Sequence, residues 1–532
     1  MSEHPFLGRS LTVMGDFTVD EMIYLFEKTR ELQEAKINKD WKAVDKFRAN
    51  GPYSKIKNPD LGIYEVFLED STRTKHSFIN AAKFHLLKHE VFDVATSSIN
   101  KSETYADSIN TILGYSNHIV NVRSKLEGVC LWLKKMGIEF AKRNNIYPLP
   151  SFINGGDGTH EHPTQELLDQ YTILNFLGWD RSHLHIALIG DQLLGRTLHS
   201  KPDGSRIFNG GIIDLIGPRE LGMPEIYIHK FEQNGFEVRI YESLDEYLAL
   251  PKNKIALIWY FTRFQLERMR PDLKDKEHIY RPMVTFQKKH LPLVPDGTVF
   301  MHPLPRYKEA PTIPNWVIPL PLNGFETQFI NGYDVRTILT AMFAGQIGED
   351  FEGEVRQIDT WSDDFIELVT SSSNGQKDIE EGVFPIPEGT VIDHICKGDE
   401  LQELKDYMHI IDTVMGFPET CYPARSPSLT DGQRKGMFFL PRLELSESEI
   451  KKLAAISPGC TVNIVKKRKV IKKMRAGTPP RIYGFSETSC KYKDCISYPS
   501  HMEGVPGEFI RINDKYICAY CEKPHHFKDI WQ

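Results

Sequence analysis

The sequence predicts an α/β protein with two parallel-sheet α/β domains, followed by a linker, an α+β domain and a small β domain. From about residue 60 to residue 348, short apolar runs alternate with helical patterns, which is typical of α/β units around parallel sheets. The composition then changes, because residues from about 352 to 387 include many acidic residues, contain a Ser-rich run and end in two prolines. Four of the eight cysteines crowd into the segment from Cys490 to Cys521, which indicates a separate metal-binding unit.

The elements of the α/β part begin with a helix from Thr18 to about Ala35. Thr18 and Glu21 form a capping box, and an apolar stripe follows at helical spacing. Five short apolar runs predict strands over residues 63–68, 119–122, 185–189, 255–259 and 298–301. Apolar residues from Val335 onward predict one more helix, which ends near Gly348.

The α+β domain is expected to open with a strand over residues 389–395. A helix capped by Ser446 and Glu449 ends at Pro458-Gly459, and residues 460–465 predict the next strand. The last small unit begins at about Arg481.

The overall charge does not favour a global nucleic-acid or membrane surface, so any basic site must be local. Across 532 residues, 65 Lys and Arg stand against 72 Asp and Glu, for a net charge of -7. The N-terminus lacks the pattern of a signal peptide, and no apolar run approaches the roughly 18 residues that a membrane helix needs. We therefore expect a cytoplasmic protein without a membrane partner.

A string of hydroxyl and basic side chains, Ser71-Thr72-Arg73-Thr74, stands where an apolar strand gives way to a helical pattern. Helix N-terminal N–H groups, hydroxyl donors and a guanidinium together suit a phosphate group. The simpler interpretation, which the short string alone favours, is a helix cap beside a surface arginine.

Further along, a glycine-rich turn leads to His162 and Gln165. These side chains suit the polarisation of a carbonyl group and the binding of an amide, although His162 alone also fits a core histidine.

Two arginines follow strand-like runs, where open α/β sheets bind ligands. Arg196 follows residues 185–189, and Arg263 with Gln265 follows residues 255–259. Guanidinium groups match carboxylates, so the pair suits a ligand with two carboxylates, whereas the simpler interpretation is a surface position for each. The loop 302–306 is rigid because of its prolines and is able to present backbone carbonyls to an N–H group.

The cysteine pattern Cys490-x4-Cys495 and Cys518-x2-Cys521 predicts a tetrahedral structural zinc site. Four buried free thiols are the alternative, which two close pairs disfavour. The basic run 466–473 lies upstream of this site, and it fits either a nucleic-acid patch or a charged hairpin.

In this order, the motifs from about Arg9 to Gly348 resemble aspartate carbamoyltransferase. The strings 71–74 and 162–165 are similar to those of all carbamoyltransferases, whereas 263–265 and 302–305 are similar to those of the aspartate enzyme. The related ornithine enzyme typically carries a cysteine where Pro303 stands. The resemblance implies the carbamoyltransferase fold and transfer of the carbamoyl group from carbamoyl phosphate to the amino group of L-aspartate. The products are N-carbamoyl-L-aspartate and phosphate, early in pyrimidine biosynthesis.

The resemblance also implies a role for each matching residue. The catalytic residues would be Arg73, Thr74, Arg123, His162 and Gln165. Carbamoyl phosphate would meet Ser71, Thr72, Arg73, Thr74, Ser97, Lys101, Arg123, His162, Gln165 and Leu304. Aspartate would meet Lys101, Arg196, Arg263, Gln265, Pro303 and Leu304. Ser97 and Lys101 match a loop that the family lends to the neighbouring subunit, which implies a homotrimer with shared sites and leaves larger assemblies of trimers open.

The expected domains are a carbamoyl phosphate domain (1–170, completed by a helix over 335–350), an aspartate domain (171–334) and the linker (351–386). One departure from the family lies after Arg196, where Pro202 is expected to kink or end a helix that the family continues.

The stretch from about Pro387 resembles the regulatory chain of the same family, here fused to the catalytic chain. The resemblance implies a ferredoxin-like domain (387–480) that binds CTP or ATP, and a domain (481–532) that holds one structural Zn²⁺ per chain. The nucleotide residues would be Asp393, His394, Lys435, Asn463, Val470 and Lys473.

Two departures weaken the implied nucleotide site. Phe439 stands where the family has a second lysine, and the proline-rich residues 417–427 replace an apolar strand. Nucleotide regulation therefore stays open against an alternative, in which the basic zinc module is a structural assembly unit or, less favoured, binds nucleic acid.

Overall fold

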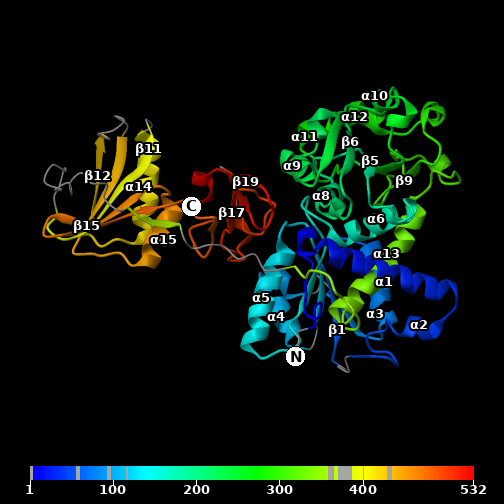
Figure 1. The fold of residues 1–532 in the computed structure, drawn as a ribbon, viewed down its shortest axis with the longest axis horizontal. Coiled ribbons are helices and arrows are strands. Elements are labelled where there is room, and N and C mark those ends of the chain that lie inside the picture. The colour runs from blue at the N-terminus through cyan, green and yellow to red at the C-terminus, as the bar shows by residue number, and fades with distance from the viewer. Residues whose placement is uncertain are drawn as a thin grey trace. The chain divides into compact units, whose positions relative to one another are not determined.

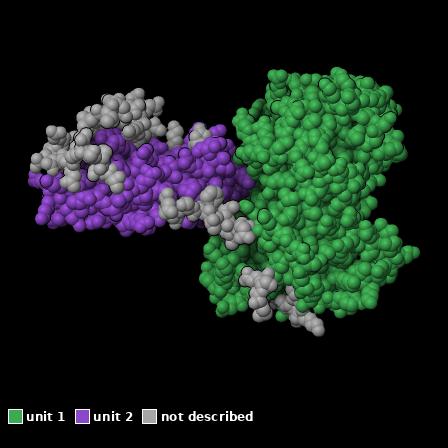
Figure 2. Space-filling view, viewed as in Figure 1, with its two compact units in different colours: residues 1–357, 494–496 green, residues 358–493, 497–532 purple. Residues whose placement is uncertain are grey.

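The computed structural model describes residues 4–55, 60–92, 97–115, 118–356, 365–369, 386–398, 401–427, 434–513 and 515–531. The chain forms two compact units, residues 1–357 with 494–496 and residues 358–493 with 497–532 (Figure 2). No helix in these described ranges has both the length and the apolar character that crossing a membrane requires.

The first unit opens with a four-stranded parallel sheet in the order β2-β1-β3-β4 (Figure 1). Its strands are β1 (Gly62–Phe67), β2 (Lys88–Val91), β3 (Ile119–Ser124) and β4 (Ser151–Asp157). The helices of this part are α1 (Val19–Ile37), α2 (Trp41–Asp45), α3 (Arg73–Phe84), α4 (Tyr105–Leu113) and α5 (Val129–Arg143). The predicted capping box of Thr18 and Glu21 is present at the start of α1. Strand β4 is buried throughout, as expected for a parallel strand covered on both faces.

A second parallel sheet in the same unit has the order β7-β6-β5-β8-β9. Its strands are β5 (Leu184–Ile189), β6 (Gly211–Ile216), β7 (Phe236–Tyr241), β8 (Ile258–Phe261) and β9 (Val299–Met301). Its helices are α7 (Arg196–His199), α8 (Lys201–Gly204), α9 (Glu225–Gln233), α10 (Leu244–Leu248), α11 (Pro271–Lys274) and α12 (Glu277–Val284). The predicted pair of parallel-sheet α/β domains is thus confirmed.

Two long helices, α6 (Pro163–Phe176) and α13 (Phe325–Phe343), lead the chain from the first sheet to the second and back, and they pack against each other (Figure 1). The helix expected over 335–350 begins at Phe325 and ends at Phe343 instead. Gly332 lies inside α13, where an added Cβ would come 2.9 Å from Leu168 of α6. A glycine at that position therefore allows the two helices to approach closely.

The expected interruption near Pro202 is present. Helix α7 ends at His199, and α8 starts anew at Lys201 with Pro202 in its first turn. A proline is tolerated in a first turn because its missing N–H would have no partner in the helix.

The second unit contains a six-stranded sheet in the order β10-β15-β14-β11-β13-β12. In chain order its elements are β10 (Ile366–Leu368), β11 (Gly389–Gly398), α14 (Leu401–Met415), β12 (Tyr422–Pro427), β13 (Arg434–Pro441), α15 (Glu447–Ile456), β14 (Thr461–Lys466) and β15 (Lys469–Ala476). Its central part follows the βαββαβ order with antiparallel pairing, which confirms the ferredoxin-like prediction.

Two expectations for this unit are corrected. The proline-rich residues 417–427 do contain a strand, β12, which pairs with β13 at the sheet edge, where Pro423 and Pro427 are tolerated. Part of the expected linker also forms a strand, β10, which pairs antiparallel with β15 and extends the sheet.

The C-terminal strands form a small antiparallel sheet in the order β16-β17-β18-β19. They are β16 (Arg481–Ile482), β17 (Phe509–Ile512), β18 (Lys515–Cys518) and β19 (Pro524–His525). This arrangement confirms the small β domain predicted from the cysteine-rich end of the chain.

Candidate active site and metal centre

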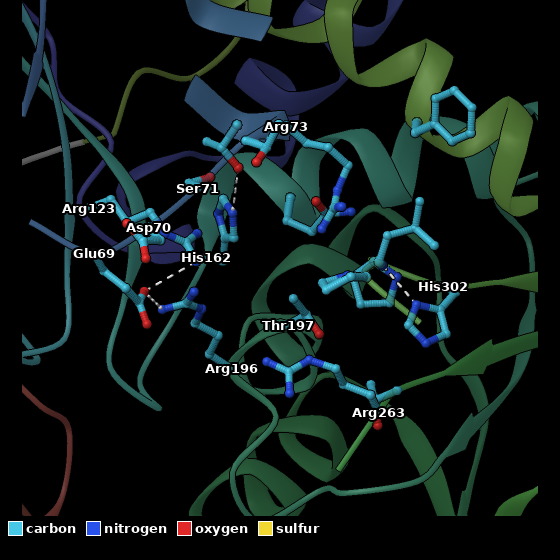
Figure 3. Close-up of a pocket in the computed structure, with 18 of the residues that line it drawn as sticks. Glu69, Asp70, Ser71, Arg73, Arg123, His162, Arg196, Thr197, Arg263 and His302 are labelled. Atoms are coloured by element: carbon cyan, nitrogen blue, oxygen red, sulfur yellow. Dashed lines mark hydrogen bonds and ion pairs between the residues drawn. The ribbon is translucent and has the colours of Figure 1, made fainter. Parts of the chain in front are cut away.

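A pocket of about 680 Å³ opens in the first unit where strands of both sheets end (Figure 3). Open α/β sheets bind ligands at this edge. Twelve of the predicted residues line it: Ser71, Thr72, Arg73, Thr74, Arg123, His162, Gln165, Arg196, Arg263, Gln265, Pro303 and Leu304. Ser97 and Lys101, which belong to the loop around the single turn Ser98–Lys101, do not line it.

The start of α3 forms the anion-binding side of this pocket. Thr72 is the N-cap residue, but its side chain makes no capping hydrogen bond, so the simpler helix-cap interpretation of this string is not met. Arg73 is the first residue of α3 and lines the pocket, and no carboxylate among the described residues pairs with its guanidinium. Backbone N–H groups, free hydroxyls and this cation together suit a phosphate group.

Thr74 and His162 bring a hydroxyl and an imidazole together from two elements. Thr74 Oγ1 lies 3.3 Å from His162 Nε2. Burial and the positive charges of Arg123 and Arg196 lower the pKa of His162 well below its ordinary value. The imidazole is therefore neutral at physiological pH, and it offers a hydrogen bond instead of a charge.

Glu69 holds three guanidiniums in the pocket, and the sequence analysis missed it. Its carboxylate lies 3.2 Å from Arg123 Nη2, 3.0 Å from Arg196 Nη1 and 2.6 Å from Arg268 Nη2. Burial alone would raise the pKa of Glu69, but the three guanidiniums hold it below its ordinary value. Glu69 thus keeps these cations close together and compensates their charges.

The opposite side of the pocket is built around Arg263. Its guanidinium pairs with Glu267 and donates to Tyr307 Oη at 3.1 Å and to the Phe264 carbonyl at 3.1 Å. Gln265 is held through its backbone N–H, which donates to Asp191 Oδ2 at 3.0 Å. The other Asp191 oxygen accepts from the Leu194 N–H at 3.0 Å. Asp191 therefore ties the strand ends that carry Gln265 and Arg196.

The affinity for the ligand at Gln265 is expected to fall in acid. Burial raises the pKa of Asp191 from 3.8 to about 6. The two backbone N–H donors lower it, but by less than burial raises it. Between these values the folded chain binds more protons than the unfolded chain, so the stability contributed by Asp191 falls as pH rises through this window. Below about pH 6 the carboxyl is protonated and the backbone of Gln265 loses an ionised acceptor.

The KM of the ligand bound by Gln265 should therefore rise as pH falls through about 6. Steady-state kinetics from pH 5 to 8 check this, and Asp191→Asn should show a KM nearly independent of pH. If the KM of the variant depended on pH in the same way as that of the wild type, the role of Asp191 would be contradicted.

The first residue of the loop 302–305, His302, is held by two hydrogen bonds, one from its backbone and one to its side chain. The His302 N–H donates to Gln328 Oε1 at 2.8 Å, and His302 Nδ1 accepts from the Leu304 N–H at 2.8 Å. Leu304 adopts a positive φ of 55°. The loop is thus locked locally, as expected from its prolines.

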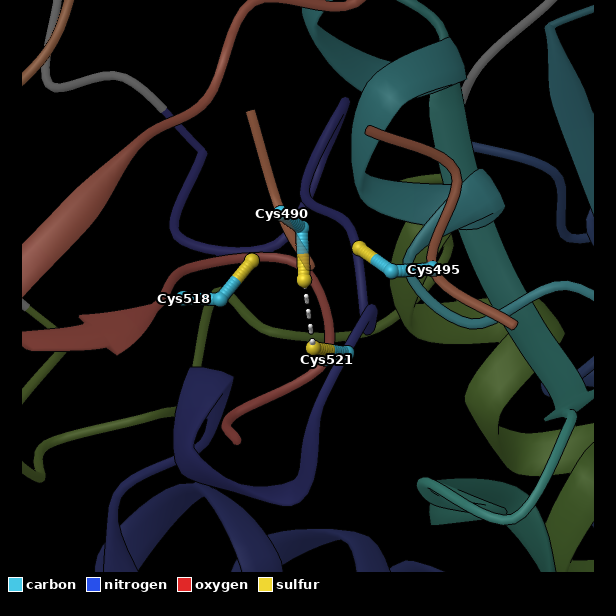
Figure 4. Close-up of side chains that lie close together, drawn as sticks. All are labelled: Cys490, Cys495, Cys518 and Cys521. Carbon is cyan, nitrogen blue, oxygen red and sulfur yellow. Dashed lines mark hydrogen bonds between the residues drawn. The ribbon is translucent and has the colours of Figure 1, made fainter. Parts of the chain in front are cut away.

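Four buried cysteines form the candidate metal centre (Figure 4). The sulfur atoms of Cys490, Cys495, Cys518 and Cys521 all lie within 4.8 Å of one another. The Sγ atoms of Cys490 and Cys521 are 3.7 Å apart, which matches two corners of a tetrahedron with Zn–S bonds of about 2.3 Å. This donor set fits a closed structural metal site.

The residues expected to bind a nucleotide lie on neighbouring strands. Lys435 Nζ on β13 pairs with Asp393 Oδ2 on β11 at 2.9 Å, and His394 Nδ1 lies 2.8 Å from Thr461 Oγ1. On the next two strands, Asn463 stands opposite Lys473. Val470 stands opposite Val465 in the same ladder.

Phe439 is fully buried beside these residues. It stands opposite Val391 and stacks on Tyr422 with ring centroids 5.3 Å apart. The missing second lysine is thus replaced by a small apolar cluster.

The basic run 466–473 forms a hairpin. Strands β14 and β15 pair across a turn in which Lys467 and Arg468 both adopt a positive φ. The run thus forms the expected charged hairpin, and this backbone geometry does not test the nucleic-acid alternative.

Three parts of the chain match models of known families. Residues 9–175 match the aspartate/ornithine carbamoyltransferase, carbamoyl-P binding domain. Residues 381–477 match the aspartate carbamoyltransferase regulatory chain, allosteric domain, and residues 480–531 match the metal binding domain of that chain.

Relatives match over the full length. The chain is 47% identical to Protein PyrBI of Treponema denticola and 48% identical to Protein PyrBI of Thermotoga maritima, with 99% of each chain covered. Among solved structures, it resembles aspartate transcarbamoylase from Trypanosoma cruzi in complex with N-(phosphonacetyl)-L-aspartic acid. That match has a TM-score of 0.52 and 27% identity, and it covers 64% of this chain and 97% of the other.

Proposed function

This chain belongs to the aspartate carbamoyltransferase family, as a catalytic chain fused to a regulatory chain, and from this membership we propose how its residues carry out and control the reaction. The reaction joins carbamoyl phosphate and L-aspartate into N-carbamoyl-L-aspartate and phosphate, as part of pyrimidine biosynthesis. The observation that supports our assignment of the site is the single pocket lined by the phosphate-type string of α3 and by Arg196 and Arg263.

The phosphate of carbamoyl phosphate binds at the start of α3. Ser71, Thr72, Arg73 and Thr74 supply hydroxyl, backbone and guanidinium donors there, and Arg123 completes the set. In the resting site Arg123 is held by Glu69, so its guanidinium is already in place when the ligand arrives. Leaving phosphate carries developing negative charge, which these fixed donors stabilise.

The carbamoyl group lies between Thr74, Arg123, His162 and Gln165. The amine of L-aspartate attacks the carbamoyl carbon, the carbonyl oxygen gains negative charge, and the bond to the phosphate oxygen breaks. Thr74, Arg123 and the neutral His162 stabilise that oxygen, while Gln165 and the Leu304 carbonyl hold the carbamoyl nitrogen. No covalent intermediate with the protein is needed, because fixed donors and positioning account for the catalysis.

L-Aspartate binds on the side of the second sheet. Arg196 binds its α-carboxylate, and Arg263 with Gln265 binds its β-carboxylate, with Pro303 and Leu304 shaping the wall. Arg196 and Arg263 are held by Glu69 and Glu267 respectively, so aspartate must share or displace these acidic partners as it binds.

Each active site is shared between two subunits of a homotrimer. Ser97 and Lys101 do not line the pocket of their own chain, which fits residues lent to a neighbour. Lys101 is exposed in this chain and therefore free to reach another subunit's phosphate and aspartate.

A mixture of two inactive variants should regain activity if the sites are shared. Arg73→Ala and Lys101→Ala each damage every site of a pure trimer. In a closed ring of three, any mixed trimer contains one site with both residues intact, so random assembly from equal amounts should restore about a quarter of wild-type activity. The assay is carbamoyl aspartate formation after the unfolded variants are refolded together. Activity no higher than the mean of the two variants would contradict the shared site.

The metal site holds one structural Zn²⁺ through Cys490, Cys495, Cys518 and Cys521. When bound, the ion would cross-link the loops around the small C-terminal sheet, and it would take no part in the chemistry of the pocket. Because four thiolates must stay reduced to bind it, we place the enzyme in the cytoplasm.

The ferredoxin-like domain binds CTP or ATP and regulates the enzyme. Asp393, His394, Lys435, Asn463, Val470 and Lys473 form the site. The match to the allosteric domain favours this role over assembly or nucleic-acid binding.

Initial rates against aspartate concentration, with and without CTP, test catalysis and regulation together. A curve shifted by CTP supports the nucleotide site, and loss of that shift in Lys435→Met locates it. An active enzyme with no response to CTP or ATP would mean that the module serves assembly, and an inactive enzyme would contradict the proposed function itself.

A further inference from the structure

A buried lysine lies behind the pocket, where helix α8 meets helix α6. Lys201 Nζ lies 2.6 Å from Glu166 Oε2 and 2.8 Å from Asp169 Oδ2. Lys201 is 1% exposed, and both carboxylates are fully buried. The ammonium also lies 4.1 Å from the centre of the Tyr260 ring. The sequence analysis gave none of these residues a role.

Asp169 connects this lysine to the wall of the pocket. While its Oδ2 faces Lys201, its Oδ1 accepts from Gln165 Nε2 at 2.9 Å and from Gln328 Nε2 at 2.6 Å. Gln328 in turn accepts the His302 N–H through its Oε1. One buried carboxylate thus supports both Gln165 and the loop that carries Leu304.

The network decides which end of the Gln165 amide faces the ligand. Its NH2 group donates to Asp169, and among the described residues no donor to its Oε1 is found. An exposed amide oxygen accepts hydrogen bonds only, so it selects a ligand group that carries N–H. A methyl group in the same place would leave it without a partner, which is costly in a shielded site.

The ammonium compensates the negative charges of Asp169 and Glu166, which it contacts directly. Two buried carboxylates side by side require cations, and the other cation whose charge reaches Asp169 is the buried Arg336. Burial would lower the pKa of Lys201, but Asp169 and Glu166 raise it above its ordinary value. Burial raises the pKa of Glu166. Without Lys201, Glu166 and Asp169 would both lose the buried cation that they share, and Asp169 would no longer be held in place from behind.

We propose that Lys201 is a positioning residue that acts through Asp169, orienting Gln165 so that the pocket prefers a carbamoyl group over an acyl group of the same shape. The proposal rests on the assignment of carbamoyl phosphate to this pocket. Lys201 itself contacts no substrate, since it is buried behind α6.

The test compares two ligands that differ only at the group Gln165 contacts. Carbamoyl phosphate carries an NH2 group where acetyl phosphate carries a methyl group. Equilibrium binding of each is measured calorimetrically on the full-length enzyme without aspartate. In Lys201→Met, the preference for carbamoyl phosphate over acetyl phosphate should fall roughly five- to tenfold, the value of about one hydrogen bond, with acetyl phosphate affinity little changed.

Two further variants separate positioning from folding. Glu166→Gln with Lys201→Met removes one buried anion together with the cation, so charge balance is kept while Asp169 still lacks its ammonium. This double variant should show the same reduced preference even if the single variant fails to fold. Lys230→Met removes a lysine that pairs with Asp203 of α8 at 3.1 Å, away from Asp169, and it should bind both ligands as the wild type does.

The outcomes distinguish the inference from its premise. An equal loss of affinity for both ligands, or an unchanged preference in the double variant, would overturn the positioning role of Lys201. A wild-type enzyme that binds carbamoyl phosphate no more tightly than acetyl phosphate would instead overturn the assignment of Gln165 to the carbamoyl group.

Discussion

Replacing Arg73 with alanine is expected to lower kcat by about a thousandfold, as is typical when one donor to a charge that develops in the transition state is removed. Arg73 stands at the head of α3, and no described carboxylate pairs with it, unlike Arg123 and Arg196, which Glu69 holds. The phosphate is therefore its natural counter-ion. Initial-rate measurements at saturating concentrations of both substrates check the prediction.

Two controls make the result specific. Arg270→Ala removes an exposed arginine whose only described ion pair is with Asp272, and it should leave kcat unchanged. His162→Ala should also reduce activity strongly, because its neutral imidazole lies beside Thr74. Unchanged turnover in both Arg73→Ala and His162→Ala would refute the assignment of the pocket.

Most of the fold was predictable because parallel strands leave a strong mark in a sequence. In the run 185–189, for example, every residue after His185 is apolar and buried, since both faces of the sheet are covered. The errors lie where local chemistry opposes tertiary packing. The prolines of β12 obscure an edge strand. The apolar spacing from Val335 onward marks only the second half of α13, which begins at Phe325.

The strand β8 shows a related limit. The apolar run 255–259 predicts a strand, but β8 covers Ile258–Phe261, because pairing with β5 and β9 begins only at Ile258. Apolar character marks burial, whereas the hydrogen-bonded register depends on neighbours far away in the chain.

The site residues that lie together in a short sequence motif were predictable. Those that contact residues far away in the sequence were not. Residues 71–74 meet His162 and Gln165 in one pocket, as the resemblance implied. Glu69 lies two residues before the first string, yet an acidic residue in an anion-binding site has no evident role until Arg196 and Arg268 are seen beside it. Lys201 likewise has the pattern of a surface residue, and only the packing of α8 on α6 buries it.

Removing the metal is expected to unfold the C-terminal domain. Residues 480–531 form a small sheet of short strands, and a unit of this size buries too little apolar surface to be stable without a cross-link. Zinc binding to four thiolates contributes about 10–16 kcal/mol in small peptides at pH 7. Cys518→Ser should therefore reduce the zinc content from about one per chain to near zero and expose residues 480–531 to rapid proteolysis.

The size of this effect follows from the burial of the thiols. All four cysteines of the cluster are nearly or fully inaccessible, so a chain without the ion must keep four thiols crowded together in a small buried space or open the domain. Cys421→Ser, a half-buried cysteine outside the cluster, should keep native zinc content and protease resistance. A Cys518→Ser protein that retains one zinc per chain would contradict the assignment. One that loses zinc yet resists proteolysis would show that the apolar core alone holds the domain together.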